Sequence, residues 1–423
     1  MPYSHLNFLI QAARHRRLLY FPLFSRRNIM SDTMQRSELH KKISDFMFAF
    51  FHWASHAGNA SLEPKMHALA VDLLEYQRLN HPLYQKYCAL HDVTSRRASF
   101  LDYPPLPVES FKRADICPFS DDLTVAEFRT SGTTENIRSI HKFRDMSLLD
   151  STLIYTFTLF IARNLPPKMR LFSLMPSHHD NPHSSLGYMI SKFIDIFGDE
   201  HSDAFFSPQS GLQCERLIDA LKTAEREHAP VHLMGPAFAY VELLDHLGTQ
   251  SIACAPGSCL LETGGYKGKS REIPKHELRN MLSAHLGIAP NCIYGEYGMC
   301  ELSSQGYECC ALNGHVPLNE SLYIFPGWLK CIVLDPDTMA PLLPGHEGQI
   351  AFFDLCNLDS AAYILTGDIG SLVPLPPDVT NATVAHPKFA LRLKGRAANA
   401  VPKGCSIAWD EWQNNALQPK IDS

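Results

Sequence analysis

Several features that would place this chain in a specialised class are missing from its sequence. Among 423 residues, 38 lysines and arginines face 44 acids, and the net charge of −6 argues against the basic surface typical of nucleic-acid-binding proteins. No apolar run reaches the roughly 18 residues that span a bilayer. The nearest runs, Phe46–Ala54 and Leu153–Ala162, are interpreted as buried helices. We expect no nucleic-acid partner and no transmembrane segment.

A disulfide framework is also missing. The 12 cysteines are scattered without regular spacing, and disulfide scaffolds are typical of small secreted domains. No apolar segment with a small-residue cleavage site marks a secretory signal peptide. We therefore expect reduced thiols and a cytoplasmic protein.

The N-terminal segment 1–34 has few acids, with none before Asp32, and it is rich in arginine. This composition is typical of an organelle transit peptide, but it also fits a leader without a role, with translation starting at Met30 or Met34. Both interpretations stay open.

Apolar residues make up 45% of the chain, enough for one large α/β domain with appendages or for two domains. Helical spacing over 35–100 predicts a helical region, and a proline-rich connector leads into an α/β core at 101–316. Short strands at 317–398 predict a β-rich antiparallel subdomain, which a tail at 399–423 follows.

The α/β core is predicted from a repeated pattern of short apolar runs that end in glycine or proline. The runs are "MRLFSLMPS", "PVHLMGP", "SCLLETGG" and "NCIYGEYG". Strands that alternate with helices favour a largely parallel sheet covered on both faces. Ligands of such sheets bind at the carboxyl ends of the strands, where these loops lie.

Five loops are candidate binding segments, and each also has a plain structural interpretation as a turn or surface residue. Backbone N–H groups and hydroxyls of Ser131, Thr133 and Thr134 could hold an anion. Gly264 and Gly265 allow close approach to a planar ligand, although "ETGGYKGKS" lacks the first glycine of a Walker A motif. The remaining candidates are Tyr297 beside a base, Glu301 for Mg²⁺, Asp368 for ribose hydroxyls and Arg396 for ribose or phosphate.

Cysteine and histidine offer further candidates. Cys405 lies between Lys403-Gly404 and Ser406, where a cation and a flexible turn favour the thiolate, although burial is the commonest fate of a cysteine. A zinc site stays open at residues whose spacing matches no recognised pattern: Cys300, Cys309, Cys310 and His315. A polar loop that could line a site carries His178, His179, Asp180 and His183.

The order of these loops along the chain resembles the order of the corresponding loops in the adenylate-forming superfamily. More closely, residues 101–412 resemble the acyl-protein synthetase (LuxE-like) family, which supplies the activating subunit of the bioluminescence fatty-acid reductase. The segments that carry this resemblance are "FRTSGTT", "MPS", "SSLGYM", "TGGYKGKS", "EYGMCELSSQ", "TGDIG" and "KGCS".

The resemblance implies an activity and a role for each candidate. A carboxylic acid, such as a fatty acid, reacts with ATP and Mg²⁺ to give an acyl-adenylate, and a cysteine takes the acyl group as a thioester for a reductase or carrier. The implied roles are phosphate loop for Ser131, Thr133 and Thr134, adenine-side loop for Gly264 and Gly265, adenine neighbour for Tyr297, Mg²⁺ support for Glu301, ribose binding for Asp368, ribose or phosphate binding for Arg396, and acyl carrier for Cys405.

Departures from the family pattern leave two alternatives open. Glu135 stands where the phosphate loop usually has glycine, and Cys300 where threonine is usual. Only residues 397–423 follow Arg396, so we expect no large mobile C-terminal domain here. The alternatives are a CoA ligase similar to phenylacetate-CoA ligases, and a non-catalytic nucleotide-binding member.

Overall fold

The computed structural model describes residues 28–55, 62–130, 138–162, 165–207, 209–264, 270–309, 321–375 and 388–396. Its helices are α2 (Asn28–Ser55), α3 (Glu63–Asn80), α4 (Pro82–Leu90), α5 (Ser110–Arg113), α6 (Ser147–Phe160), α7 (Ser185–Phe197), α8 (Cys214–Arg226), α9 (Ala237–Leu247) and α10 (Lys275–Leu286). Its strands are β1 (Leu106–Pro107), β2 (Ala126–Arg129), β3 (Ile140–Phe143), β4 (Arg170–Ser173), β5 (Asp203–Ala204), β6 (Phe206–Ser207), β7 (Gly211–Leu212), β8 (Val231–Pro236), β9 (Cys259–Thr263), β10 (Ile293–Tyr297), β11 (Gly306–Glu308), β12 (Leu322–Ile324), β13 (Leu329–Leu334), β14 (Glu347–Asp354), β15 (Tyr363–Pro374) and β16 (Phe389–Arg396). Single 3₁₀ turns lie at Phe100–Asp102, Asp121–Leu123 and Pro290–Cys292.

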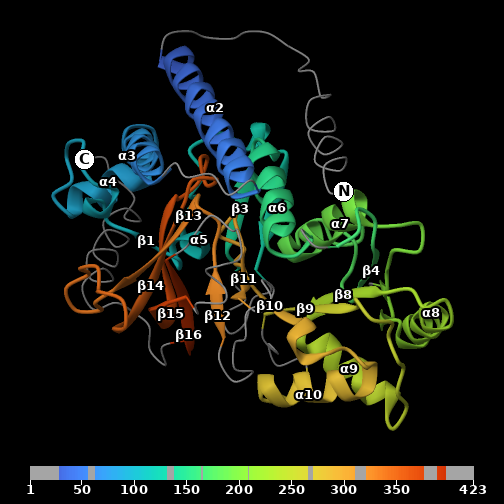
Figure 1. Ribbon diagram of the computed structural model, residues 1–423. Helices are drawn as coiled ribbons and strands as arrows, with labels where there is room; N and C mark the ends of the chain where they lie inside the picture. Colours follow the sequence, from blue (N-terminus) through green and yellow to red (C-terminus); the bar gives the residue numbers. More distant parts are fainter. Residues whose placement is uncertain are drawn as a thin grey trace, which may run out of the picture.

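One large sheet runs through the described part of the chain in the order β13-β14-β15-β16-β12-β11-β10-β9-β8-β4-β5, and β1 pairs with β15 (Figure 1). Strands β10, β9, β8, β4 and β5 pair with one another in parallel, whereas the pairings from β10–β11 to β14–β13 along the sheet are antiparallel. The predicted α/β fold, with a parallel core and an antiparallel β region, is confirmed. The two regions are continuous, because β10 and β11 pair at Glu296 and Tyr307.

The parallel strands are apolar because helices cover both of their faces. Alternate residues of β8 belong to different cores: Met234 packs with the residues of α6 and α7, and Leu233 with those of α8, α9 and α10. Figure 1 shows these two helical layers on opposite sides of the strands. The carboxyl ends of the strands stay open to the loops that follow them.

The N-terminal helices share the core of the main body. The Phe51 ring on α2 stacks on Tyr155 of α6 at 4.6 Å, and Phe50 meets Trp328 edge-on at 5.5 Å. Gly327 leaves the room that Phe50 needs, because a Cβ there would lie 2.0 Å from its ring. The helices therefore dock firmly on the antiparallel half of the sheet. Across the described ranges, no helix combines the length and apolarity that crossing a membrane requires.

Candidate nucleotide site

Three residues singled out from separate motifs converge at the ends of neighbouring strands. The Tyr297 hydroxyl, at the end of β10, donates a 2.6 Å hydrogen bond to Oδ2 of Asp368 on β15. Arg396 lies directly opposite Asp368 on β16, with its Nε 3.4 Å from Oδ1. Antiparallel pairing of β15 with β16 thus joins the "TGD" and "GR" motifs into one polar group.

Tyr297 is enclosed, whereas Arg396 is open to solvent. The Tyr297 side chain is 7% exposed and packs against the rings of Tyr323, Phe325 and Phe352. Burial, together with the neighbouring Asp368 carboxylate, raises the pKa of Tyr297 well above its usual value, so the phenol stays a donor. The Arg396 side chain is 83% exposed and can turn toward an anion. One carboxylate oxygen of Asp368 is occupied, and the other faces the guanidinium.

Glu301 lies in the segment after β10 and is only 5% exposed. Burial raises the pKa of its carboxyl, while Ser139, Lys112 and Arg396 act in the opposite direction. Arg396, which also faces Asp368, is thus one of the cations whose charge acts on the Glu301 carboxyl. A buried carboxylate beside cationic side chains is suited to bind a metal–phosphate group.

The described residues on either side of the predicted phosphate loop belong to a hairpin that contacts the Glu301 segment. Ser131, Thr133 and Thr134 lie outside the described residues, but Thr130 and Ser139 flank their loop on the β2–β3 hairpin. The Thr130 N–H donates to the Ser139 carbonyl at 3.1 Å, and the Ser139 N–H donates to Thr130 Oγ1 at 2.9 Å. His141 Nδ1 lies 2.9 Å from the Cys300 carbonyl oxygen, which fixes the hairpin against the Glu301 segment.

The glycine loop follows β9, next to β10 in the sheet. Gly264 has a φ of +65°, a left-handed conformation that favours glycine. Gly265 lies outside the described residues. The polar loop that follows β4 contacts the hairpin, because the Arg129 N–H donates to the His183 carbonyl at 2.9 Å.

Sequence reasoning missed a buried ionic cluster beneath the glycine loop. Arg279 on α10 donates to Glu308 at 2.7 Å and lies 3.3 Å from Glu262. Lys275 donates to the other oxygen of Glu308 at 2.7 Å. Burial alone would raise the pKa of Glu308, but Lys275 and Arg279 hold it below its usual value. Charged residues inside otherwise apolar strands, such as Glu262 in "CLLETGG", were the available signal.

A second missed carboxyl is Glu296, directly before Tyr297. It points away from Asp368 and contacts the Thr263 hydroxyl on β9. Burial raises the pKa of Glu296 to about 7. Among the described residues, the side chain that contacts this carboxyl is a threonine, so no cation offsets the effect of burial on its pKa.

Cys405 lies outside the described residues, as do Cys310 and His315 of the zinc hypothesis. Within the described ranges, no three histidine, cysteine or acidic side chains lie where they could hold a metal ion together.

Comparison with known proteins gives a family and a fold. The family model "Acyl-protein synthetase, LuxE" matches residues 61–412. A long-chain-fatty-acid--luciferin-component ligase from Aliivibrio fischeri is 20% identical over 345 residues, which cover 80% of this chain and 85% of that protein.

Several solved structures are similar to this chain in fold. An open form of 2-hydroxyisobutyryl-CoA ligase, in complex with 2-HIB-AMP and CoA, superposes with a TM-score of 0.55 at 13% identity, over 79% of this chain and 77% of that one. Its thioesterification state gives 0.57 at 12% identity, over 79% and 68%. ATP-bound MatB from Rhodopseudomonas palustris gives 0.43 at 16% identity over 66% of this chain, which spans about half (49%) of that protein. The likeness to the CoA ligase shows a shared fold.

Proposed function

Because this chain belongs to the acyl-protein synthetase family LuxE and is a ligase, we propose that it activates a fatty acid with ATP and transfers the acyl group to its own thiol. The observation that carries the proposal is the convergence of Tyr297, Asp368 and Arg396 at the ends of neighbouring strands. The relative from Aliivibrio fischeri, a long-chain-fatty-acid ligase by name, supports the class of substrate.

In the first step, a carboxylate oxygen of the acid attacks the α-phosphorus of ATP, and the bond to the β-phosphate breaks. Acyl-adenylate forms and pyrophosphate leaves. Asp368 accepts hydrogen bonds from the ribose hydroxyls, and Arg396 binds ribose or phosphate. Ser131, Thr133 and Thr134 donate to the phosphates.

The residues around the phosphates and the base complete the nucleotide site. Gly264 and Gly265 let the backbone approach adenine, with Tyr297 behind it. Glu301 fits Mg²⁺ because it is a buried carboxylate in the segment that the β2–β3 hairpin contacts through His141 and Cys300. When bound, Mg²⁺ would neutralise phosphate charge.

In the second step, the Cys405 thiolate attacks the acyl carbonyl carbon, and the carbon–oxygen bond to AMP breaks. A thioester forms, and AMP leaves as a stable anion. The thioester is then available to a reductase or to another acyl acceptor.

Pyrophosphate release with a panel of fatty and aryl acids tests the first step. Intact-protein mass after incubation with ATP and mixed acids then reports acylation and the size of the acyl group. Cys405→Ser should release pyrophosphate but carry no hydroxylamine-labile acyl group. No pyrophosphate with any acid contradicts adenylation, and unchanged labelling of Cys405→Ser contradicts the nucleophile.

Two outcomes would favour the alternative functions. Acyl-CoA formed only when CoA is added, without acylated protein, would indicate a CoA ligase. Nucleotide binding without pyrophosphate release would indicate a non-catalytic member, for which Glu135 in the phosphate loop is the supporting feature.

A further inference from the structure

Asn357, in the loop between β14 and β15, holds the backbone of the Glu301 segment. Its side chain is buried, with 1% exposed. Its Nδ2 donates to the Glu301 carbonyl at 2.9 Å and to the Ala361 carbonyl at 2.8 Å. Its Oδ1 accepts from the N–H and the hydroxyl of Ser303, at 3.0 and 2.7 Å. All the hydrogen-bonding positions of the amide are thus used.

The arrangement demands an amide at this position. A carboxylate of the same shape could accept from Ser303, but it would face two carbonyl oxygens without a proton to offer. An apolar side chain would leave buried groups without partners, which is strongly unfavourable. Asn357 is therefore matched to both sides of the contact, and Glu301 depends on it for the position of its backbone.

The N-terminal helices in turn hold the loop that carries Asn357. From α3, Gln77 donates to the Asn357 carbonyl at 2.8 Å and accepts from the Ala362 N–H at 3.1 Å. From α2, Arg36 donates through Nε to Asp359 at 2.7 Å. Gln77 and Arg36 thus fix the loop from two different helices.

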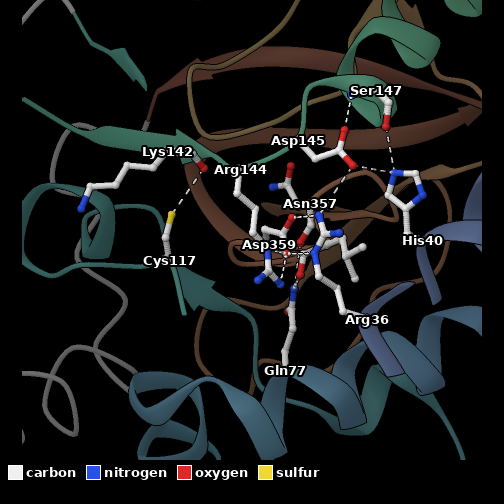
Figure 2. Close-up of polar contacts among 11 residues, drawn as sticks. Arg36, His40, Gln77, Cys117, Lys142, Arg144, Asp145, Ser147, Asn357 and Asp359 are labelled. Carbon is white, nitrogen blue, oxygen red and sulfur yellow. Dashed lines mark hydrogen bonds and ion pairs between the residues drawn. The ribbon is translucent and has the colours of Figure 1, made fainter. Parts of the chain in front are cut away.

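A second arginine reaches the same carboxylate from the main body. Arg144 donates through Nε to Asp359 at 2.9 Å, and Figure 2 shows the two guanidinium groups converging on it. Arg36, Arg144 and Asp359 have side-chain exposures of 13%, 17% and 12%, so little solvent screens this group. The loop is clamped between the helices and the body.

We propose that Asn357 is a positioning residue for Glu301, and that α2 and α3 set its place through Arg36 and Gln77. The proposal rests on the proposed function, in which Glu301 supports the metal–phosphate group. A contiguous path of described contacts joins the helical region to that carboxylate: Arg36 to Asp359, along the loop to Asn357, and from its amide to Glu301. Small displacements at a reacting centre reduce rates strongly, so the path has a kinetic effect.

Hydrogen exchange of residues 298–305 tests whether Asn357 holds the backbone of the Glu301 segment, and this measurement does not depend on activity. Asn357→Asp should raise exchange there, because both donor bonds are lost. Arg36→Ala removes one of the two guanidinium groups that bind Asp359 and should raise exchange in the same segment by a smaller factor. The control is Ser202→Ala, which also removes part-buried hydrogen bonds, to the Leu171 N–H and the Met169 carbonyl, but at β4, which β8 and β9 separate from β10. Unchanged exchange of 298–305 in Asn357→Asp would overturn the proposal.

A double-mutant cycle tests the catalytic part. We expect Asn357→Asp to lower kcat/KM for ATP in pyrophosphate release about tenfold to a hundredfold. If Asn357 acts through Glu301, adding Asn357→Asp to Glu301→Gln should cost little more. Fully multiplicative losses would overturn the proposal. A wild-type protein without pyrophosphate release would instead contradict the proposed function, and the exchange result would still decide the role of Asn357.

Discussion

The Tyr297 hydroxyl donates a hydrogen bond of 2.6 Å to Asp368, joining residues 71 positions apart in the chain. A buried tyrosine with a raised pKa is a permanent donor, so Asp368 keeps one orientation before any ligand arrives. A binding carboxylate that is already oriented avoids an ordering cost when the ligand binds. The pair therefore prepares the position that we propose for ribose binding.

Tyr297→Phe removes this donor and keeps the ring. We expect KM for ATP to rise about threefold to tenfold, because one hydrogen bond to a charged group is lost. Tyr84→Phe is the matched control, since it removes a buried hydroxyl that donates to the Pro104 carbonyl at 3.1 Å, remote from the site. Steady-state pyrophosphate release gives both KM values, and equal values for wild type and Tyr297→Phe would contradict the assigned role.

Arg396→Ala should raise KM for ATP by about tenfold and leave thermal stability nearly unchanged. The guanidinium is exposed and contributes little to folding, but a charge-assisted bond to ribose or phosphate would be lost. Lys394→Ala, on the same strand and paired with Glu347 at 3.6 Å, controls for the loss of a surface cation. Similar KM values for the two variants would argue against a specific role of Arg396.

The acid limb of the pH–rate profile should report Glu301. Burial raises its pKa, so Glu301 binds a proton at a higher pH than an ordinary carboxylate and loses its charge there. The kcat/KM for ATP should therefore fall with decreasing pH, starting above the usual carboxyl range. Glu301→Gln should have a low kcat/KM that lacks this limb, and an unchanged limb in the variant would assign it to another group.

Glu296 should make folding less favourable as the pH rises. Its pKa is about 7 when folded and near 4.5 when unfolded, so the folded state binds more protons between these values. Stability from this group is full below pH 4.5 and is lost as the pH rises through 7. Glu296→Gln should remove this loss and gain roughly 1–3 kcal/mol relative to wild type between pH 5 and pH 8.

Denaturant unfolding of both proteins at several pH values checks the effect of Glu296. The difference between the two curves isolates Glu296 from the buried histidines, such as His141, whose pKa burial lowers to about 4. A stability difference that does not change with pH would show that Glu296 does not titrate in this range.

The sequence predicted site residues that lie in short motifs, but it did not predict contacts between residues far apart in the chain. Asp368 and Arg396 were predicted from the short motifs "TGD" and "GR" and from the family resemblance. Each was expected after a strand, whereas Asp368 lies within β15 and Arg396 is the last residue of β16. Their direct pairing was not predicted, since it depends on β16 lying beside β15.

The residues that support the site could not be predicted from the sequence, because their contacts also join distant parts of the chain. Arg36 and Asp359 are 323 positions apart, and no periodicity connects a helical arginine with an aspartate in a loop. Asn357 lies in "DLCNLDS", which resembles an ordinary polar turn, and only the fold brings its amide to the Glu301 backbone. The domain boundary at residue 316 stays a prediction, although strand pairing continues across it.

The strand order also constrains how the protein is made on the ribosome. Strand β16 lies between β12 and β15, both of which are synthesised earlier. Until residues 389–396 have left the ribosome, β12 and β15 each have an edge whose backbone N–H and carbonyl groups are unpaired. Such edges can pair with other extended chains. Closing that gap is the step that brings Arg396 to Asp368. Completion of the sheet and completion of the proposed nucleotide site are therefore the same event in biogenesis.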